Sequence, residues 1–171
     1  MLYLIEAVFS ASMLRADHAP LSIALQPLDK TNVTQLKLLN ASLLPIHYTE
    51  RFYRAVLQRP SHSRLAFANG KHVGMICCRE ERKGEEHVLY IMTLGCLVMF
   101  RRRGVGSALV RFVVELAREV GAARIQLHVH SINEDAVMFY QRFGFVVREE
   151  LPGYYRYLTP PSAVLLVKEL G

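Results

Sequence analysis

The segment Phe100–Val110, "FRRRGVGSALV", constrains the fold more than any other part of the chain. In it three arginines run into two closely spaced glycines, and an apolar helical pattern begins at once. It follows the long apolar run of residues 87–98, which is typical of a strand buried on both faces. Backbone N–H groups point outward at the start of a helix, where the helix dipole is positive. The chain must therefore contain a strand, a tight turn and a helix whose N-terminus favours an anion such as phosphate.

Three glycine motifs bind phosphate groups at such a turn, and the sequence fits them unequally. A P-loop requires a lysine after its second glycine, and no lysine stands in this segment. A dinucleotide-binding fingerprint requires a third glycine, where this chain has Leu109. The pattern R-x-x-G-x-G is matched by Arg101, Gly104 and Gly106. Because so short a pattern often arises by chance, this turn alone is equally compatible with a basic helix start that binds nothing.

The rest of the chain predicts an α/β fold with seven strands and four helices. Hydrophobic alternation and apolar runs indicate strands, and a period of 3.6 residues indicates helices. Strands interleaved with helices in this order are typical of a mixed central sheet. A polar loop is expected at residues 80–86, and Ser131 and Glu134 are spaced as a capping box. The expected strands lie within residues 21–27, the hairpin 64–80, 87–98, 123–130, 145–150 and 162–170, and the expected helices within 31–43, 49–59, 104–120 and 131–143.

Length and charge limit the domain organisation and the partners. The chain of 171 residues is expected to form one domain over residues 21–171, after a disordered leader at residues 1–20. The leader is apolar but contains Glu6 and lacks a basic start, so a cleaved targeting peptide is the less favoured alternative. The net charge of +6 suits an anionic partner: nucleic acid, a phosphorylated cofactor or a ribosome surface. Because the basic residues are scattered, direct nucleic-acid recognition is not expected.

The cysteines and the apolar runs exclude further classes of protein. Cys77, Cys78 and Cys96 are odd in number, and two of them are adjacent, so neither a disulfide framework nor a zinc site is indicated. We expect buried thiols in a reducing compartment, and no metal. No apolar run reaches the roughly 18 residues that would span a membrane.

Two segments, "YIMTLGCLVMFRRRGVGSALV" and "LHVHSINEDAVMFYQRFGF", resemble the GNAT superfamily of acetyl-CoA-dependent N-acetyltransferases. The resemblance extends over residues 21–170. In that superfamily the turn R/Q-x-x-G-x-G/A holds the CoA pyrophosphate, and the second segment packs beside the pantetheine. The resemblance implies a GNAT fold, a mixed central β-sheet of about seven strands flanked by about four helices, with acetyl-CoA as co-substrate. The cofactor-binding residues that it implies are Leu94, Gly95, Cys96, Arg101, Arg102, Arg103, Gly104, Val105, Gly106, Ser107, Asn133 and Tyr140.

Four shorter segments, "LLPIHY", "YIMTLGCL", "LHVH" and "GYYRYL", are similar to the catalytic subunits of NatE N-terminal acetyltransferases. Those enzymes acetylate the α-amine of nascent chains that start with methionine and a hydrophobic residue. The chain departs from them at Leu44, where phenylalanine is usual, and at His130, where glutamine is usual. "ELPGYY" also resembles the NatF group, but the chain stops at Gly171 without the Golgi-directed extension of that group. We therefore expect a cytoplasmic NatE-like enzyme, monomeric in isolation, with NatA-type subunits and the ribosome as candidate partners.

Acetyl transfer to an amine requires a group that removes the amine proton. An α-amine has a pKa near 8, so a modest base is sufficient. In the resembled family, residues matching Tyr90 and His128 hold a water that accepts this proton, and the residue matching Tyr140 protonates the CoA thiolate. Without the resemblance, Tyr90 and His128 would be interpreted as core residues. Tyr140 lies on the apolar face of its helix and fits a core residue equally well. The substrate-binding residues that the resemblance implies are Leu44, Pro45, Ile46, Tyr48, Met92, Tyr154 and Tyr155.

Two other functions are compatible with the same fold. One is an acetyltransferase for lysine or small amines, and the other is a non-catalytic acetyl-CoA-binding subunit of a ribosome-associated complex. "LLPIHY" and "GYY" favour a peptide substrate, because a methionine pocket serves no purpose for a small polyamine. Tyr90 and His128 argue against a non-catalytic subunit.

Overall fold

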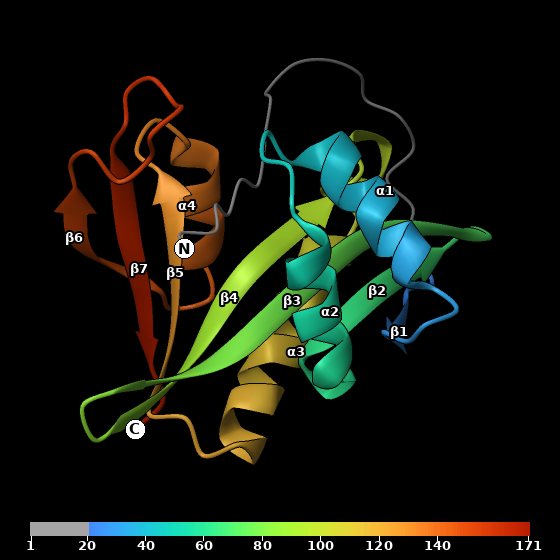
Figure 1. The fold of residues 1–171 in the computed structure, drawn as a ribbon, viewed down its shortest axis with the longest axis horizontal. Helices are drawn as coiled ribbons and strands as arrows, with labels where there is room; N and C mark the ends of the chain where they lie inside the picture. Colours follow the sequence, from blue (N-terminus) through green and yellow to red (C-terminus); the bar gives the residue numbers. More distant parts are fainter. Residues whose placement is uncertain (1–20) are drawn as a thin grey trace.

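A seven-stranded β-sheet forms the centre of the computed structural model, which describes residues 21–171 (Figure 1). The predicted leader, residues 1–20, lies outside the described residues. The strand order is β1-β2-β3-β4-β5-β7-β6, and β4 and β5 are the one parallel pair in this sheet. The strands are β1 (Ala24–Pro27), β2 (Ser63–Ala68), β3 (Lys71–Lys83), β4 (Glu86–Cys96), β5 (Arg124–His130), β6 (Val146–Leu151) and β7 (Ala163–Glu169).

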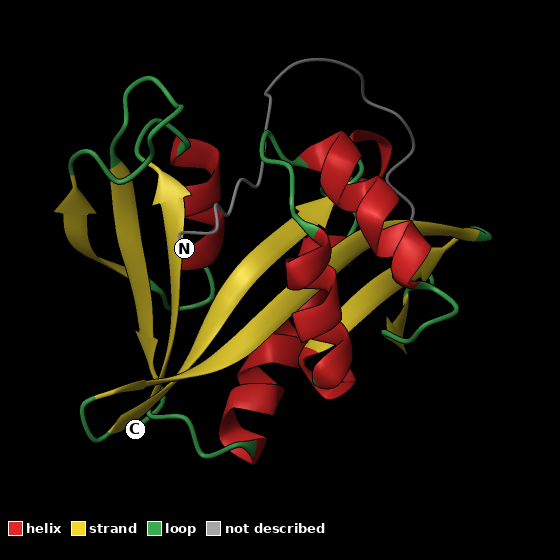
Figure 2. Cartoon of the chain, in the orientation of Figure 1, coloured by secondary structure: helices red, strands yellow, loops and turns green. Residues whose placement is uncertain are grey.

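Four α-helices cover the two faces of the sheet (Figure 2). One hydrophobic cluster joins α1 and α2 to one face, and a larger cluster joins α3 and α4 to the other. The helices are α1 (Val33–Leu43), α2 (Glu50–Gln58), α3 (Val105–Glu119) and α4 (Glu134–Gln141). The predicted mixed sheet of seven strands with four helices is confirmed. No helix within residues 21–171 is long and apolar enough to cross a bilayer.

Strand β4 contains a β-bulge at Met92. Cys77 of β3 lies opposite Thr93, and Cys78 lies opposite Ile91, so Met92 is an extra residue in the register. A bulge bends its strand and increases its twist. It also reverses the alternation of side chains along β4.

The bulge coincides with the place where β4 and β5 separate (Figure 1). The two strands pair over Val88–Tyr90 and Arg124–Gln126, and no pairing joins them beyond this in the described residues. Before the bulge, Tyr90 belongs to the cluster under α1 and α2; after it, Leu94 belongs to the cluster under α3 and α4. The sheet therefore opens at its centre, and β4 contributes side chains to both sides of the opening.

Two local predictions were wrong. The polar loop expected at residues 80–86 is instead the end of a hairpin: β3 continues to Lys83 and β4 begins at Glu86. Partners on other elements stabilise this charged stretch, since Glu80 accepts a hydrogen bond from His62 at 2.9 Å and contacts His87 of β4 at 2.7 Å.

The second error concerns the start of α4. Ser131 and Glu134 do not form a capping box, because Asn133 is the N-cap and its Oδ1 accepts the hydrogen bond of Ala136 N at 3.1 Å. An asparagine directly before the first helical residue is a strong cap, and it displaces the longer serine motif.

The three thiols are all free cysteines. Cys77 and Cys78 are buried and Cys96 is half-buried. Burial raises the pKa of Cys77 to about 11 and that of Cys96 to about 12. A thiol with so high a pKa is a poor nucleophile, so the cysteines are parts of the core.

Gly74 of β3 lies where α3 approaches the sheet most tightly. A β-carbon at this position would meet the carbonyl oxygen of Gly95 at 2.8 Å and Val105 Cγ1 at 2.9 Å. The first contact is with the backbone of β4, which cannot rotate away, and the second is with α3, so a side chain here would overpack the contact between β3, β4 and α3.

We predict that Gly74→Ala lowers the free energy of unfolding by about 1–3 kcal/mol, because the added methyl group overpacks this contact. Urea unfolding followed by circular dichroism measures it. Gly171→Ala is the matched control, since a β-carbon there meets nothing within 4 Å. Equal stability of the two variants would show that α3 does not depend on close approach at Gly74.

Candidate active site

The arginine-glycine turn adopts a backbone that suits an anion-binding helix start. Arg102 has φ +57° and Gly104 has φ +92°, and α3 begins directly afterwards at Val105. The first backbone hydrogen bond across the helix start runs from Ala108 N to Gly104 O. The N–H groups of residues 105–107 precede it and point out of the helix end, and the first turn holds no acidic residue.

The three arginines of the turn have different environments. Arg101 is half-buried and donates from Nε to Cys96 O at 3.1 Å, which ties the turn to the end of β4. The Arg103 guanidinium lies 5.9 Å from the centre of the Phe100 ring. Arg102 is exposed. Arg101 therefore helps to shape the turn as well as adding positive charge.

Gly106 brings α3 and α4 close together. A β-carbon on Gly106 would lie 3.0 Å from Phe139 Cζ, so the ring of α4 fills the space that a side chain would take. The N-cap Asn133 lies at the start of the same helix α4. Both residues were predicted to bind cofactor, and both help to set how α4 packs beside the turn.

The end of β4 supplies the other predicted cofactor residues. Leu94 is buried, and Cys96 is half-buried. A β-carbon on Gly95 would meet Met75 Cε at 2.9 Å and Leu43 Cδ1 at 3.0 Å, so α1 packs over this glycine. These three residues follow the bulge, and they line the part of β4 that no longer pairs with β5.

Tyr90 and His128 meet where the two strands separate. The Tyr90 hydroxyl and His128 Nδ1 are 2.8 Å apart. The His128 ring stacks on Tyr154, with centroids 4.3 Å apart and planes at 20°. Tyr154 in turn contacts the edge of Tyr155, with centroids at 4.8 Å. The structure thus brings together two predicted catalytic residues and two predicted substrate residues.

Burial sets the protonation states of this pair. It raises the pKa of Tyr90 far above that of an ordinary tyrosine, and the neighbouring Tyr154 raises it further. Burial also lowers the pKa of His128 to about 4, and the positive charges of Lys83 and Arg79 add to this effect. At neutral pH both groups are therefore uncharged: the phenol keeps its proton and the imidazole can accept one.

The two loops that carry the predicted substrate residues contact each other. Ile46, in the loop between α1 and α2, packs with Tyr154, Tyr155 and Leu158 of the loop between β6 and β7. In the α1–α2 loop Leu44 is buried and Pro45 is exposed.

Tyr48 is half-buried beside α2. Its ring centroid is 4.4 Å from that of Phe52. Met92, the bulge residue, is buried in the cluster under α1 and α2, against which Tyr48 packs. Met92 also lines a cavity of about 290 Å³ beneath α2. Of the predicted substrate residues, Tyr154 thus contacts His128 directly, while Leu44, Tyr48 and Met92 share the cluster under α1 and α2 with Tyr90.

Residues 33–145 match the family described as Acetyltransferase (GNAT) family. The chain belongs to the GNAT acetyltransferase family. The sequence-based expectation of a GNAT fold and an acetyl-CoA-dependent acetyltransferase is confirmed.

Individual relatives refine the family assignment. The chain is 40% identical over 140 residues to "N-alpha-acetyltransferase 50" of Danio rerio, covering 81% of this chain and 83% of the relative. It is 37% identical over 150 residues to "Probable N-acetyltransferase san" of Drosophila melanogaster, covering 87% and 82%. A solved structure, Arabidopsis thaliana Naa50 in complex with the bisubstrate analogue CoA-Ac-MVNAL, superposes with a TM-score of 0.80 at 34% identity, covering 87% of this chain and 99% of that chain.

Tyr140 of this GNAT chain lies on the other side of the opening from Tyr90. It is fully buried in the cluster under α3 and α4, and its ring contacts Phe145 edge-on at 5.3 Å. Its buried hydroxyl makes no hydrogen bond with the described residues. Burial also raises its pKa well above the ordinary tyrosine value, so the hydroxyl keeps its proton. A buried hydroxyl without a partner is costly, which is a reason to expect a ligand atom there.

Two residues beside the reacting pair were given no role by the sequence. The Arg79 guanidinium lies 4.8 Å from the centre of the Tyr90 ring, and its Nε donates to Glu81 at 2.7 Å. Residues from 80 onward were interpreted as a loop, so the cross-strand position of Arg79 opposite Tyr90 could not be seen. His130 donates from Nε2 to Pro160 O at 2.6 Å and supports the β6–β7 loop. The alternation of β5 placed His130 beside His128, but the loop partner had no sequence signal.

We predict that His128 titrates with a midpoint near pH 4, because burial and two neighbouring cations disfavour its protonated form. Its imidazole 13C–1H signal, assigned by comparison with His128→Asn, reports the midpoint. A histidine-containing peptide in the same buffers should titrate near 6.5. A His128 midpoint at or above 6.5 would contradict the uncharged state proposed for this site.

Proposed function

We propose that this chain is an N-terminal α-amino acetyltransferase, which transfers the acetyl group of acetyl-CoA to protein N-termini that start with methionine and a hydrophobic residue. The observation that carries the proposal is the Tyr90–His128 contact at the point where β4 and β5 separate. On one side of this contact lies the turn before α3. On the other side lie the α1–α2 loop, which carries Leu44 and Ile46, and the β6–β7 loop, which carries Tyr154 and Tyr155. The names of the two curated relatives and the bisubstrate complex support the same reaction.

The α3 turn and the end of β4 are proposed to hold acetyl-CoA. The outward N–H groups at residues 105–107 and the guanidinium groups of the turn suit a diphosphate. The unpaired side of β4, residues 92–96, offers backbone groups to an extended ligand. The buried Tyr140 hydroxyl, which has no partner in the described residues, is proposed to give its proton to the departing thiolate.

Tyr90 and His128 are proposed to position a water that accepts the amine proton. The amine nitrogen forms a bond to the acetyl carbon, the carbon–sulfur bond breaks, and the amine proton passes through the water to solvent. The departing thiolate takes the proton of Tyr140, which solvent then restores. Because His128 is a weak base, its role is to orient and polarise this water, with the Tyr90 hydroxyl as second anchor. A weak base is sufficient, since an α-amine is already partly neutral near pH 8.

The two loops are proposed to form the pocket for the first methionine. Leu44 and Ile46 offer apolar surface, and the rings of Tyr154 and Tyr155 stand opposite. Tyrosine combines a large apolar surface with a hydroxyl that can bind a peptide backbone. An unbranched methionine adapts well to such a mixed pocket. By resemblance to NatE, we also propose NatA-type subunits and the ribosome as partners and the cytoplasm as the site of action.

We predict that a Met-Leu peptide is acetylated with a kcat/KM about ten- to a hundredfold above Ser-Glu and Ala-Glu peptides of equal length, with Met-Lys between them. Losing a buried side chain of methionine size costs roughly 1.5–3 kcal/mol, which corresponds to that ratio. Mass spectrometry of the acetylated products measures the rates. Preference for Ser-Glu or Ala-Glu would point to another class of N-terminal acetyltransferase, and faster acetylation of internal lysine would favour the lysine enzyme.

We predict that Tyr90→Phe lowers kcat about 100-fold and leaves the Kd for acetyl-CoA nearly unchanged, because the variant loses a proton-handling hydroxyl without losing the ring. Steady-state kinetics and calorimetry separate the two effects. Tyr157→Phe is the matched control: Tyr157 is 95% exposed in the β6–β7 loop, so its hydroxyl should not matter. Near-normal kcat in folded Tyr90→Phe would remove Tyr90 from the mechanism.

A further inference from the structure

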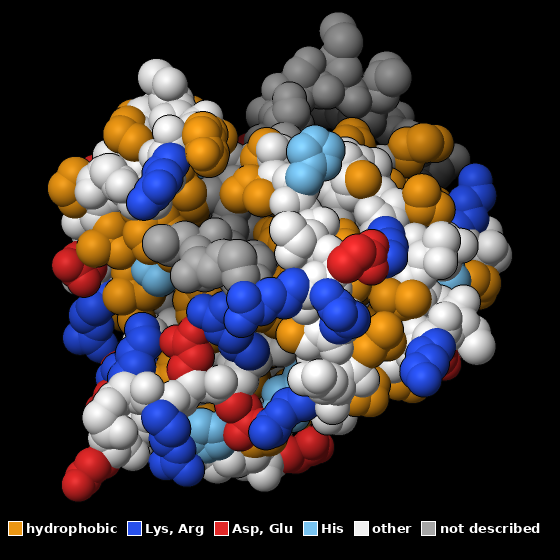
Figure 3. All heavy atoms as spheres, in the orientation of Figure 1, with side chains coloured by type: hydrophobic (Ala, Val, Ile, Leu, Met, Phe, Trp, Pro, Cys, Tyr) orange, Lys and Arg blue, Asp and Glu red, His pale blue; other side chains and the backbone are white. Residues whose placement is uncertain are grey.

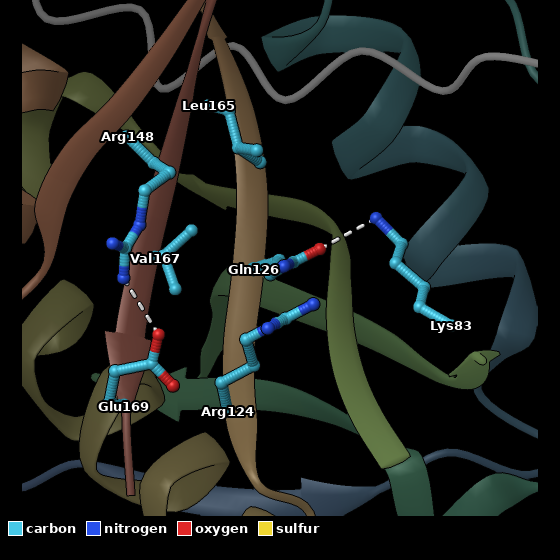
Figure 4. Close-up of a pocket in the computed structure, with 7 residues that line it drawn as sticks. All are labelled: Lys83, Arg124, Gln126, Arg148, Leu165, Val167 and Glu169. Atoms are coloured by element: carbon cyan, nitrogen blue, oxygen red, sulfur yellow. Dashed lines mark hydrogen bonds and ion pairs between the residues drawn. The ribbon is translucent and has the colours of Figure 1, made fainter. Parts of the chain in front are cut away.

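A second cavity, of about 440 Å³, lies beside the reacting pair on the same face of the sheet (Figure 4). Its floor is made of β5 and β7, and its walls are β6 and the end of the β3–β4 hairpin. The residues that line it are Lys83, Arg124, Gln126, Arg148, Leu165, Val167 and Glu169. In the space-filling view, lysine and arginine side chains gather over this part of the molecule (Figure 3).

The cavity adjoins the reacting pair along β5. Arg124, Gln126 and His128 point to the same face, and His128 pairs with Leu165, which also lines the cavity. Two residues along a strand span about 6.6 Å, so the cavity begins within about 7 Å of His128 and extends about 13 Å from it. Beyond His128 in the other direction, His130 contacts Tyr155 and the β6–β7 loop covers the strand. A chain whose first residue lies at His128 can therefore leave along the open cavity.

The charges of the cavity are not fully balanced. Arg124 Nη1 lies 2.6 Å from Glu86, and Arg148 Nη2 lies 2.8 Å from Glu169. Lys83 is different, because its Nζ donates to the neutral amide oxygen of Gln126 at 2.7 Å (Figure 4). The carboxylate of Glu81 lies 4.0 Å from Nζ, beyond hydrogen-bond distance, and Glu81 is already paired with Arg79 at 2.7 Å.

Lys83 can therefore accept a carboxylate from outside. An ammonium has three donors, and Gln126 takes one of them while fixing the side chain in place. The lysine side chain is 43% exposed, so a ligand can reach it. Its positive charge is also one of the causes that lower the pKa of His128, so it acts within electrostatic range of the reacting pair.

We propose that this cavity is a subsite for the substrate polypeptide downstream of its second residue, and that Lys83 there selects an acidic side chain. An extended peptide advances about 3.3–3.6 Å per residue, so with the first residue at His128 the third to fifth residues lie over the cavity, and the sixth lies just beyond it. The inference rests on the proposed function and deepens it. It adds a charge preference to a specificity that otherwise depends on the first two residues.

The test compares Met-Leu peptides that carry a single Glu or Gln at position 3, 4, 5 or 6. The measured quantity is the ratio of kcat/KM for Glu over Gln at each position, which cancels general effects of a variant on catalysis. In the wild-type enzyme the ratio should reach about two- to fivefold at one or more positions in low salt, the range of a single exposed ion pair. It should fall toward one in 0.5 M NaCl, because salt screens such a pair.

Three variants decide the assignment. Lys83→Gln should bring the ratio to about one, and Lys83→Glu should instead favour peptides with Lys at the same position. Lys71→Gln is the matched control, since Lys71 is an exposed lysine at the β2–β3 turn, and it should keep the wild-type ratio. A wild-type ratio of one at every position, or an unchanged ratio in folded Lys83→Gln, would overturn the inference.

The outcomes separate this inference from the proposed function. If Met-Leu peptides are acetylated but Glu and Gln are treated alike, the subsite is wrong and the enzyme activity stands. If no Met-Leu peptide of either kind is acetylated, the proposed function fails and the subsite fails with it.

Discussion

The separation of β4 from β5 is the feature on which the rest of the molecule depends. Three residue pairs hold the two strands together, and the bulge at Met92 then bends β4 away. A continuous sheet would have placed Tyr90 and Leu94 on one face, and no path would have joined the two faces. Because the sheet opens, a ligand at the α3 turn and a polypeptide at the α1–α2 and β6–β7 loops can meet beside Tyr90 and His128.

Burial is the dominant electrostatic effect at this meeting point. It disfavours the charged forms of Tyr90, Tyr140 and His128, which keeps the two tyrosines protonated and the histidine neutral. The nearby cations Arg79 and Lys83 act in the same direction on His128. The site is therefore suited to a neutral amine attacking a neutral thioester, in which charge appears only as the reaction proceeds.

Much of the fold could be predicted from the sequence, because the patterns that indicate its helices, strands and turns are local. The hairpin expected at residues 64–80, the periodic apolar face of α3 and the long apolar run of β4 each depend on neighbouring residues. The Tyr90–His128 contact was reached only through resemblance, since 38 residues separate the two side chains along the chain.

The structural features that could not be predicted from the sequence depend on contacts between distant elements. The bulge at Met92 leaves no mark in a continuous apolar run, because its residue types match those of a regular strand. The charged end of β3 looked like a loop, since its partners His62 and His87 lie on other elements. The Lys83 cavity was missed for the same reason, as Gln126 and Arg148 reach it from strands that are remote in sequence.

The opening also has a consequence for solubility. A strand without a neighbour is a place where another chain can add its own strand, and such edges promote aggregation. In this protein one such edge, residues 92–96 of β4, faces inward, between two hydrophobic cores and opposite β5. A foreign strand needs about 4.8 Å of clear width beside the edge and room for its side chains on both faces. In the proposed function acetyl-CoA lies along this unpaired backbone of β4, so the bound ligand occupies the place that a foreign strand would need.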